Sequence, residues 1–188
     1  GYLDFNGTNN YVAIRDLNYN TTGALPALTV EAWGRTSYVG GGYNGNWAIV
    51  DFDRSDFFNF YVRVDNGRVG FSTYSGGTHD MTGNQVVNDG QWHHLAVVYD
   101  GTDKIIYVDG QEDARVLNPH GGSALGRNRT RFGFLGDGSE ASSFDGSRNN
   151  IYFEGQLTEV RLWEAARTEL EIADHRTLRL DGNEYGLI

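Results

Sequence analysis

Apolar and polar positions alternate in short runs along most of the chain, and turn signals containing glycine separate these runs. The clearest example is the stretch 89–110, where three Asp-Gly pairs bracket two runs rich in Val, Ile, Tyr and Trp. Asp-Gly readily adopts the positive φ angles of hairpin turns, and β-branched and aromatic residues favour strands. The stretch therefore predicts a hairpin with strands at 92–99 and 104–108.

The predicted strand 92–99 carries apolar side chains on both of its faces. Val97 and Tyr99 lie on one face, and Ala96 and Val98 lie on the other. A strand that is covered on both sides belongs in the middle of a layered protein. We therefore expect this hairpin to form the centre of the fold.

The same alternation predicts further strands, with polar loops between them. The stretch 74–89 is predicted to be a loop, and the stretch 111–129 to be mostly irregular. Thr168 and Glu171 form a capping-box pattern, which predicts a short helix that ends near His175. The further predicted strands are 2–5, 11–14, 28–35, 47–52, 57–64, 68–73, 131–135 and 152–163.

Many short strands with one helix favour an all-β fold, an antiparallel two-sheet sandwich with one short C-terminal helix. Residues 1–188 are expected to form one domain. Glycine supplies 26 of the 188 residues and proline only 2, which suits tight turns better than a disordered linker. The absence of cysteine excludes disulfide bonds and thiolate chemistry. The start Gly-Tyr-Leu, without Met, indicates a module taken from a longer protein.

The formal net charge of -10 limits the possible partners. An acidic surface repels phosphate backbones, so we expect no nucleic acid partner. No apolar run approaches the roughly 20 residues of a membrane-spanning helix, so we expect no membrane insertion. The acidity does suit a protein that binds Ca²⁺ through carboxylates.

Three segments carry a family resemblance. They are LDFNG at 3–7 with Tyr11-Val12, DGQWHHL at 89–95 with YVDG at 107–110, and GQL at 155–157 leading to EVRLW at 159–163. Together they resemble the laminin G-like and pentraxin-like branch of the concanavalin A-like jelly rolls. This resemblance implies a jelly-roll fold. Members of the family bind sugars, peptides, proteins or phosphorylated small molecules, often through Ca²⁺. Such chains often continue with a strand beyond a Glu-x-Gly-Leu sequence, which is expected to be missing here after Ile188.

The loop 136–150 is dense in Asp, Asn, Ser and Gly, and Ca²⁺ takes six to eight oxygen ligands in flexible geometry. The resemblance also implies calcium here, because pentraxins hold it in a loop at this place and draw a further ligand from the turn before a strand like 57–64. The alternative is that these residue types merely form loops and Asx turns. The predicted Ca²⁺ ligands are Asp137, Glu140, Asp145, Asn149 and Asn150, with Asp53 and Asp56 from the turn.

A ligand-binding surface is expected beside this loop. Aromatic and imidazole side chains in or near loops can stack on sugar rings or on apolar groups, and binding groups gather on loops. The strand 57–64 also presents a polar face opposite an apolar one. The alternative is an ordinary solvated face, and for Trp47 a packing role in the core or at its rim. The candidate ligand contacts are Tyr43, Trp47, Tyr74, His79, Asn59, Tyr61 and Arg63.

Catalytic patterns are weak. The chain has no Gly-x-Ser-x-Gly elbow, and the carboxylate pair Asp51 and Asp53 lacks the two Glu residues that glycosidases of this fold place on one strand. Adjacent strand residues point to opposite faces, so His93 and His94 cannot share one metal ion.

The leading hypothesis is a non-catalytic extracellular or cell-surface module, as in bacterial adhesins, that binds carbohydrate or peptide through Ca²⁺. A polysaccharide-cleaving glycosidase or lyase and a structural spacer remain the alternatives.

Overall fold

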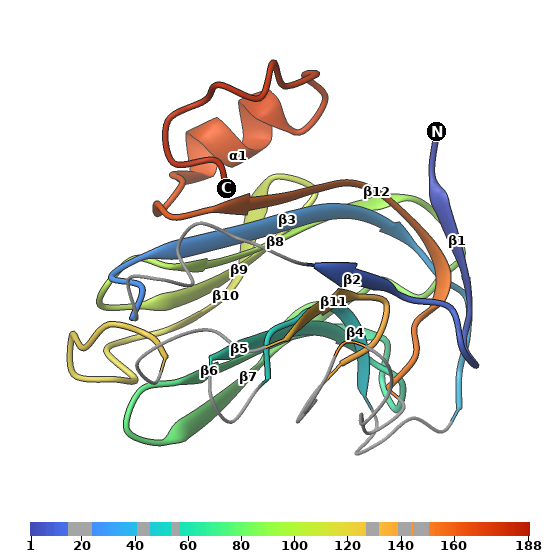
Figure 1. Ribbon diagram of the computed structural model, residues 1–188, viewed down its shortest axis with the longest axis horizontal. Coiled ribbons are helices and arrows are strands. Elements are labelled where there is room, and N and C mark those ends of the chain that lie inside the picture. Colours follow the sequence, from blue (N-terminus) through green and yellow to red (C-terminus); the bar gives the residue numbers. More distant parts are fainter. Residues whose placement is uncertain (15–23, 41–45, 54–56, 127–131, 139–143, 145–150) are drawn as a thin grey trace.

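A computed structural model describes residues 1–14, 24–40, 46–53, 57–126, 132–138, 144 and 151–188. Two antiparallel sheets of six strands face each other, and the helix α1 (Glu169–His175) lies over the outer face of one of them (Figure 1). This arrangement confirms the predicted jelly-roll sandwich with a short C-terminal helix.

The sheet beneath α1, here sheet A, contains in spatial order β1 (Leu3–Asn6), β12 (Glu154–Trp163), β3 (Leu28–Arg35), β8 (His93–Tyr99), β9 (Lys104–Val108) and β10 (Gln111–Val116). The opposite sheet, here sheet B, contains β2 (Val12–Ile14), β11 (Gly133–Leu135), β4 (Asn46–Asp51), β5 (Phe58–Arg63), β6 (Arg68–Tyr74) and β7 (Thr78–Val86).

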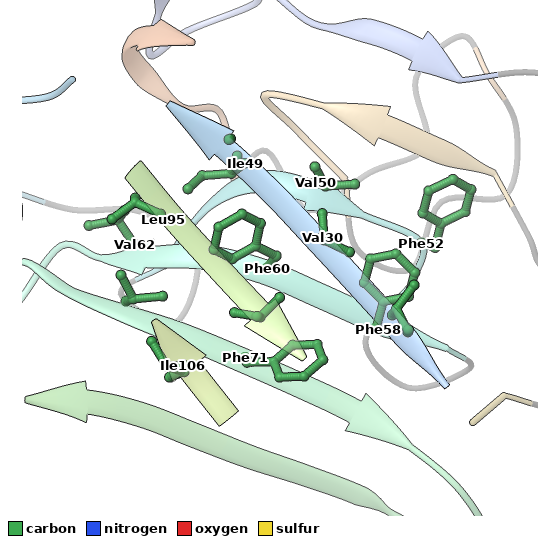
Figure 2. Close-up of a cluster of buried hydrophobic side chains, with 14 of the residues drawn as sticks. Val30, Ile49, Val50, Phe52, Phe58, Phe60, Val62, Phe71, Leu95 and Ile106 are labelled. Carbon is green, nitrogen blue, oxygen red and sulfur yellow. The ribbon is translucent and has the colours of Figure 1, made fainter. Parts of the chain in front are cut away.

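Large apolar side chains from the facing sides of the two sheets fill the space between them (Figure 2). Phe58, Phe60 and Val62 project inward from β5, as the alternation in the sequence predicts, and Val30 and Leu95 meet them from sheet A. The hairpin of β8 and β9 is confirmed, and β8 is buried on both faces except at its first residue. Burial of this apolar area is the main stabilising term of such a sandwich.

One cation lies within this core. The Lys104 ammonium on β9 donates to the backbone carbonyls of Phe71 and His79 on sheet B, both at 2.7 Å, and the side chain is fully buried. Its Nζ atom also lies 4.8 Å from the centre of the Phe71 ring. Lys104 therefore links the two sheets through hydrogen bonds inside a mostly apolar layer.

Two strands differ from the sequence prediction. The structure has β7 where a loop is predicted at 74–89, and β10 where the chain is predicted to be mostly irregular after residue 111. Both are edge strands, and each has few buried side chains. An edge strand that faces solvent can be polar along its length, so it lacks the hydrophobic alternation that reveals central strands.

The two edge strands are joined to each other. Asp113 lies where the register between β10 and β9 shifts, and its carboxylate accepts hydrogen bonds from the backbone N–H groups of Asn84 (2.7 Å) and Gln85 (3.0 Å) on β7. The Asn84 side chain in turn donates to the Asp113 carbonyl. These bonds close one side of the sandwich and occupy backbone groups of β7 that would otherwise remain open.

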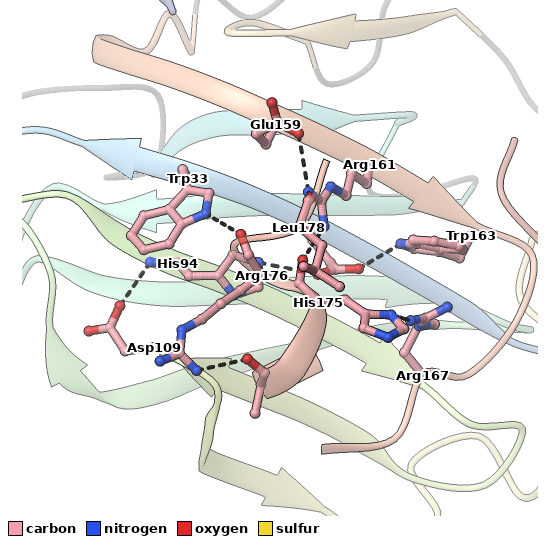
Figure 3. Close-up of polar contacts among 12 residues, drawn as sticks. Trp33, His94, Asp109, Glu159, Arg161, Trp163, Arg167, His175, Arg176 and Leu178 are labelled. Carbon is pink, nitrogen blue, oxygen red and sulfur yellow. Dashed lines mark hydrogen bonds and ion pairs between the residues drawn. The ribbon is translucent and has the colours of Figure 1, made fainter. Parts of the chain in front are cut away.

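Ile172 of α1 packs on an apolar patch of sheet A formed by Ala96, Val98, Ile105 and Tyr107, and a group of polar contacts lies beside this patch (Figure 3). The capping box is confirmed, since Thr168 accepts from the Glu171 backbone and the Glu171 side chain reaches back to Thr168. Beneath the helix, the Trp163 indole donates to buried Glu31 at 2.6 Å. His94 Nε2 lies 3.2 Å from the other Glu31 oxygen, within ion-pair distance but without hydrogen-bond alignment.

No helix among the described residues is long and apolar enough to cross a membrane.

Candidate ligand site on the outer face of sheet B

A single row of side chains crosses the outer face of sheet B. The register pairs Phe134 on β11 with Asp51 on β4, Asp51 with Asn59 on β5, Asn59 with Ser72 on β6, and Ser72 with Asp80 on β7. Directly opposite residues of paired strands place their side chains on the same face. Four adjacent strands therefore each contribute one polar side chain to this row.

Three of the four polar members of the row are buried although they face away from the core, and the fourth, Asp80 on the edge strand, is exposed. Asn59 is 2% exposed, and Asp51 and Ser72 are fully buried. Ser72 donates to the Asp80 carboxylate at 2.7 Å, and its hydroxyl lies 3.3 Å from that of Tyr61. Among the described residues, Oδ1 of Asn59 has no hydrogen-bond partner. A buried amide oxygen of this kind is an acceptor that a ligand or cation can use.

The turn after β4 brings Asp53 to one end of the row. The Asp53 backbone donates to Oδ1 of Asp51 at 2.7 Å, and Asp53 holds a left-handed φ of 68°. Non-glycine residues adopt this conformation rarely, most often as Asn or Asp in turns. The predicted turn residue Asp53 therefore lies beside the row, bonded by its backbone N–H to the Asp51 side chain.

The segment after β11 reaches the same place. A Cβ atom at Gly138 would lie 2.4 Å from Cβ and 2.7 Å from Oδ1 of Asp51, and Gly138 has a φ of 145°. Only glycine allows the backbone to pass this close to Asp51. The preceding residue, Asp137, is fully buried. The segments that carry Asp53 and Asp137 thus meet beside Asp51, at one end of the row.

The remaining predicted calcium ligands, Glu140, Asp145, Asn149, Asn150 and Asp56, lie outside the described residues, as does Tyr43. Within the described part of the chain, no group of three or more His, Asp or Glu side chains could hold a metal ion. The row still offers features that fit a cation: side-chain oxygen atoms, among them the acceptor Oδ1 of Asn59, and the close packing of the Gly138 backbone on Asp51. The calcium site stays a prediction.

Three predicted ligand contacts lie on the outer face. Asn59, Tyr61 and Arg63 alternate with the core residues of β5, as predicted. Tyr61 is only 1% exposed and packs across Gly70 of β6. Arg63 is half-buried, and it forms a two-point ion pair with Asp65, with nitrogen–oxygen distances of 2.9 and 2.6 Å. These hydrogen bonds raise the pKa of Arg63 and lower that of Asp65.

Two other predicted contacts face away from this surface. Trp47 is 3% exposed and packs on Tyr38 in the core, with ring centres 4.3 Å apart, so the core alternative applies to it. His79 lies on the opposite face of β7 from Asp80, and its ring is 5.9 Å from that of His120. Burial and the Lys104 charge lower the pKa of His79. Tyr74 is half-buried at the end of β6, on the same face as Ser72.

Ser72 and Asp80 are not identified as site residues from the sequence. The sequence indicates Asp51 only as a possible catalytic group. Asp80 lies on β7, where the sequence predicts a loop. The signal for Ser72 is the alternation in β6, where Val69 and Phe71 are core residues and Gly70 and Ser72 point outward. That alternation reveals the face but not the register that places Ser72 beside Asn59.

Comparisons with known proteins agree with this architecture. The family model described as concanavalin A-like lectin/glucanases superfamily, of laminin G type, matches residues 6–173. A search of curated proteins by sequence found no match. Many solved structures share the fold.

Among these structures is a candidate carbohydrate-binding protein from Bacteroides ovatus, with a TM-score of 0.68 and 18% identity over 98% of this chain and 50% of that chain. The chain thus spans about half the length of this Bacteroides protein. The heptameric SAP-like pentraxin from Limulus polyphemus gives a TM-score of 0.67 and 18% identity over 98% of this chain and 87% of that chain.

Domain 4 of AbnA, an extracellular arabinanase from Geobacillus stearothermophilus solved with arabinotriose, gives a TM-score of 0.64 and 17% identity over 92% of this chain and 79% of that chain. At such identities the structural likeness establishes the fold alone, whereas the family match covers most of the sequence. The chain belongs to the concanavalin A-like lectin/glucanase superfamily, as a laminin G-like jelly roll.

Proposed function

We propose that this domain is a non-catalytic module that binds carbohydrate on the outer face of sheet B, with Ca²⁺ held at the Asp51 end of the polar row. The observation that carries the proposal is the in-register row of Asp51, Asn59, Ser72 and Asp80 on the outward side of a sheet, of which the first three are buried and Asp80 is exposed. A mostly buried row of oxygen-bearing side chains is suited to hydroxyl groups and cations rather than to an apolar ligand.

In this proposal Asp53 and Asp137 would supply carboxylates at the Asp51 end, and the predicted ligands Glu140, Asp145, Asn149 and Asn150 would complete the shell. A bound Ca²⁺ would supply a fixed positive charge that coordinates a hydroxyl pair or carboxylate of the ligand. This charge would also let an acidic protein attract an anionic ligand.

Carbohydrate is favoured over peptide because the row presents hydroxyl, amide and carboxylate groups in place of the apolar pockets that read peptide side chains. The arabinanase domain and the Bacteroides protein lend support at the level of fold analogy. The same analogy, with the laminin G match, supports an extracellular or cell-surface setting within a larger protein.

Calorimetric titration with Ca²⁺ tests the metal. We expect binding by the wild type, and an affinity at least about tenfold lower in Asp137→Asn and Asp53→Asn, because each removes one charged ligand. Asp174→Asn is the matched control, since Asp174 is exposed on α1, on the opposite side of the sandwich. No heat of binding, together with a melting temperature that chelation leaves unchanged, would refute the calcium part.

A glycan array and a peptide array, each read with Ca²⁺ and with a chelator, test the ligand class. We expect glycan signals that disappear on chelation and no peptide signals. Incubating the best glycan with the domain and examining it by mass spectrometry tests the absence of catalysis. Cleavage that is lost in both Asp51→Asn and Asp53→Asn would instead establish an enzyme of the same fold.

A further inference from the structure

A second recess lies on the opposite side of the sandwich. It is a pocket of about 760 Å³ on the outer face of sheet A, bounded by β3, β12, the residue before β8 and the segment that follows α1. Its lining includes Trp33, Trp92, Arg161, Arg176, Thr177 and Arg179, which we call the arginine–tryptophan pocket. This volume is within the range of pockets that hold small ligands.

The charge of this pocket is opposite to that of the whole protein. Three arginines line it against one carboxylate, Glu159, whereas the chain as a whole carries a formal charge of -10. Glu159 pairs with Arg161 at 3.1 Å. Among the described residues neither Arg176 nor Arg179 has an ion-pair partner, although the Arg176 guanidinium donates to the Ala173 carbonyl at 2.9 Å.

Arg161 holds one wall of the pocket in place. Its side chain is 4% exposed, and its guanidinium donates to the carbonyls of His175 (3.0 Å) and Leu178 (2.6 Å) (Figure 3). Glu159, which pairs with Arg161, has a left-handed φ of 49° at the bulge between β12 and β3. Bulges commonly re-aim side chains beside functional sites. Arg161 thus acts as a positioning residue that fixes the segment with Arg176 and Arg179 against the sheet.

The two indoles form the other wall. Trp33 is anchored, because its N–H donates to the Arg176 carbonyl at 2.8 Å and its ring meets His94 edge-on at 5.5 Å (Figure 3). Trp92 is half-buried, and the exposed ring of Tyr2 lies 6.0 Å from it. No residue of the described chain accepts a hydrogen bond from the Trp92 N–H. An aromatic face beside an accessible guanidinium group, here that of the exposed Arg179, suits a sugar ring that bears an anion.

We propose that the arginine–tryptophan pocket binds an acidic saccharide, whose sugar ring packs on Trp92 and whose carboxylate pairs with the exposed Arg179. Arginine binds carboxylates through two parallel hydrogen bonds, and the exposed Thr177 adds a hydroxyl for the sugar. The acidic remainder of the surface repels extended polyanions, so a short carboxylated sugar fits better than a nucleic acid. This site is separate from the row on sheet B and requires no metal.

Calorimetry with trigalacturonate and with neutral galactotriose, both in a chelator, tests the proposal. The chelator removes any contribution of a calcium site, so this result does not depend on the proposed function of sheet B. We expect the wild type to bind trigalacturonate and to prefer it to galactotriose. Affinity should fall at least about tenfold in Arg179→Gln, because a charged hydrogen-bonding partner is lost.

Trp92→Ala should weaken both sugars, whereas Trp92→Phe should retain much of the binding, because it keeps an aromatic face. Arg68→Gln is the matched control, an exposed arginine on β6 of the other sheet, and its binding should equal that of the wild type. Circular dichroism verifies that each variant is folded. The proposal is overturned if the wild type ignores trigalacturonate, if Arg179→Gln binds it as well as the wild type, or if an acetylated tri-glutamate peptide binds more tightly than trigalacturonate.

Discussion

The carboxylate of Asp113 on sheet A accepts a hydrogen bond from the backbone N–H of Asn84 on sheet B, at 2.7 Å. A second backbone N–H, that of Gln85, donates to the other carboxylate oxygen at 3.0 Å. One side chain therefore joins the edges of both sheets, and it does so at the bulge of β10.

Replacing Asp113 with alanine removes both bonds and leaves two backbone donors on β7 to solvent. Hydrogen bonds to a charged acceptor contribute roughly 1.5–3 kcal/mol when sheltered and less near solvent, so we expect a loss of about 1–3 kcal/mol in unfolding free energy. Urea denaturation measures it. Asp174→Ala, at an exposed position on α1, is the control and should change stability little. Equal stability of the two variants would show that the edges are held by other contacts.

Lys104 predicts an unusual dependence of stability on pH. Burial lowers the pKa of its ammonium from the ordinary 10.5 to about 7, although Asp80 opposes this shift. Between pH 7 and 9 the unfolded chain therefore binds a proton that the folded chain lacks, so the unfolding free energy rises with pH, by roughly 2 kcal/mol over this window. Below pH 7 both states are protonated and the full cost of burying the charge remains.

Urea denaturation of the wild type and of Lys104→Met at pH 7, 8 and 9 measures this effect, as the difference in stability between the two proteins at each pH. His93 acts in the opposite direction: burial lowers its pKa, but its bonds to Asp109 and Asp89 raise it overall, so its contribution is lost as the pH rises above 6.5. That contribution is common to both proteins and cancels in the difference. A stability difference that does not change between pH 7 and 9 would exclude titration of Lys104 in this range.

Gly138 is predicted to be essential to the calcium end of the row. Gly138→Ala would place a Cβ atom 2.4 Å from that of Asp51 at a φ of 145°, so the segment must move away. We expect weaker Ca²⁺ binding and a lower melting temperature. Gly76→Ala separates the two causes, because Gly76 also has a positive φ of 69°, but a Cβ atom added there would have no neighbouring atom within 4 Å. Calorimetry should find calcium affinity unchanged in Gly76→Ala.

The Trp163 indole is predicted to stabilise the layer beneath α1. Trp163→Phe removes the 2.6 Å bond to Glu31, a carboxylate that is 1% exposed. A buried charge that loses a donor costs about 2–4 kcal/mol. Trp33→Phe also deletes one indole N–H, but its acceptor is a partly buried carbonyl, so we expect a smaller loss. Thermal and urea unfolding should rank the two variants in this order, and the reverse order would contradict the argument.

Much of the fold follows from local patterns in the sequence. The hairpin of β8 and β9, the inward set Phe58, Phe60 and Val62, and the capping box at Thr168 each depend on residues close in the chain. The polar edge strands β7 and β10 do not, because their order comes from pairing with β6 and β9 and from the Asp113 bonds.

The candidate site is only partly predictable for the same reason. The alternation in β5 places Asn59 and Tyr61 on one face, but the neighbours of Asn59 depend on register. Trp47 illustrates a further limit. The register between β4 and β5 shifts after Ala48, so that Ile49 and Val50 both belong to the core together with Trp47, and strict alternation cannot anticipate this.

In the row across sheet B, the side chain on each strand can be replaced independently of the others. Asp51, Asn59, Ser72 and Asp80 are held by backbone ladders that do not depend on which side chain each position carries. One substitution can therefore alter the chemistry offered to a ligand without altering strand pairing. Such a surface can change its specificity stepwise, in evolution or by design, while the scaffold beneath it stays constant.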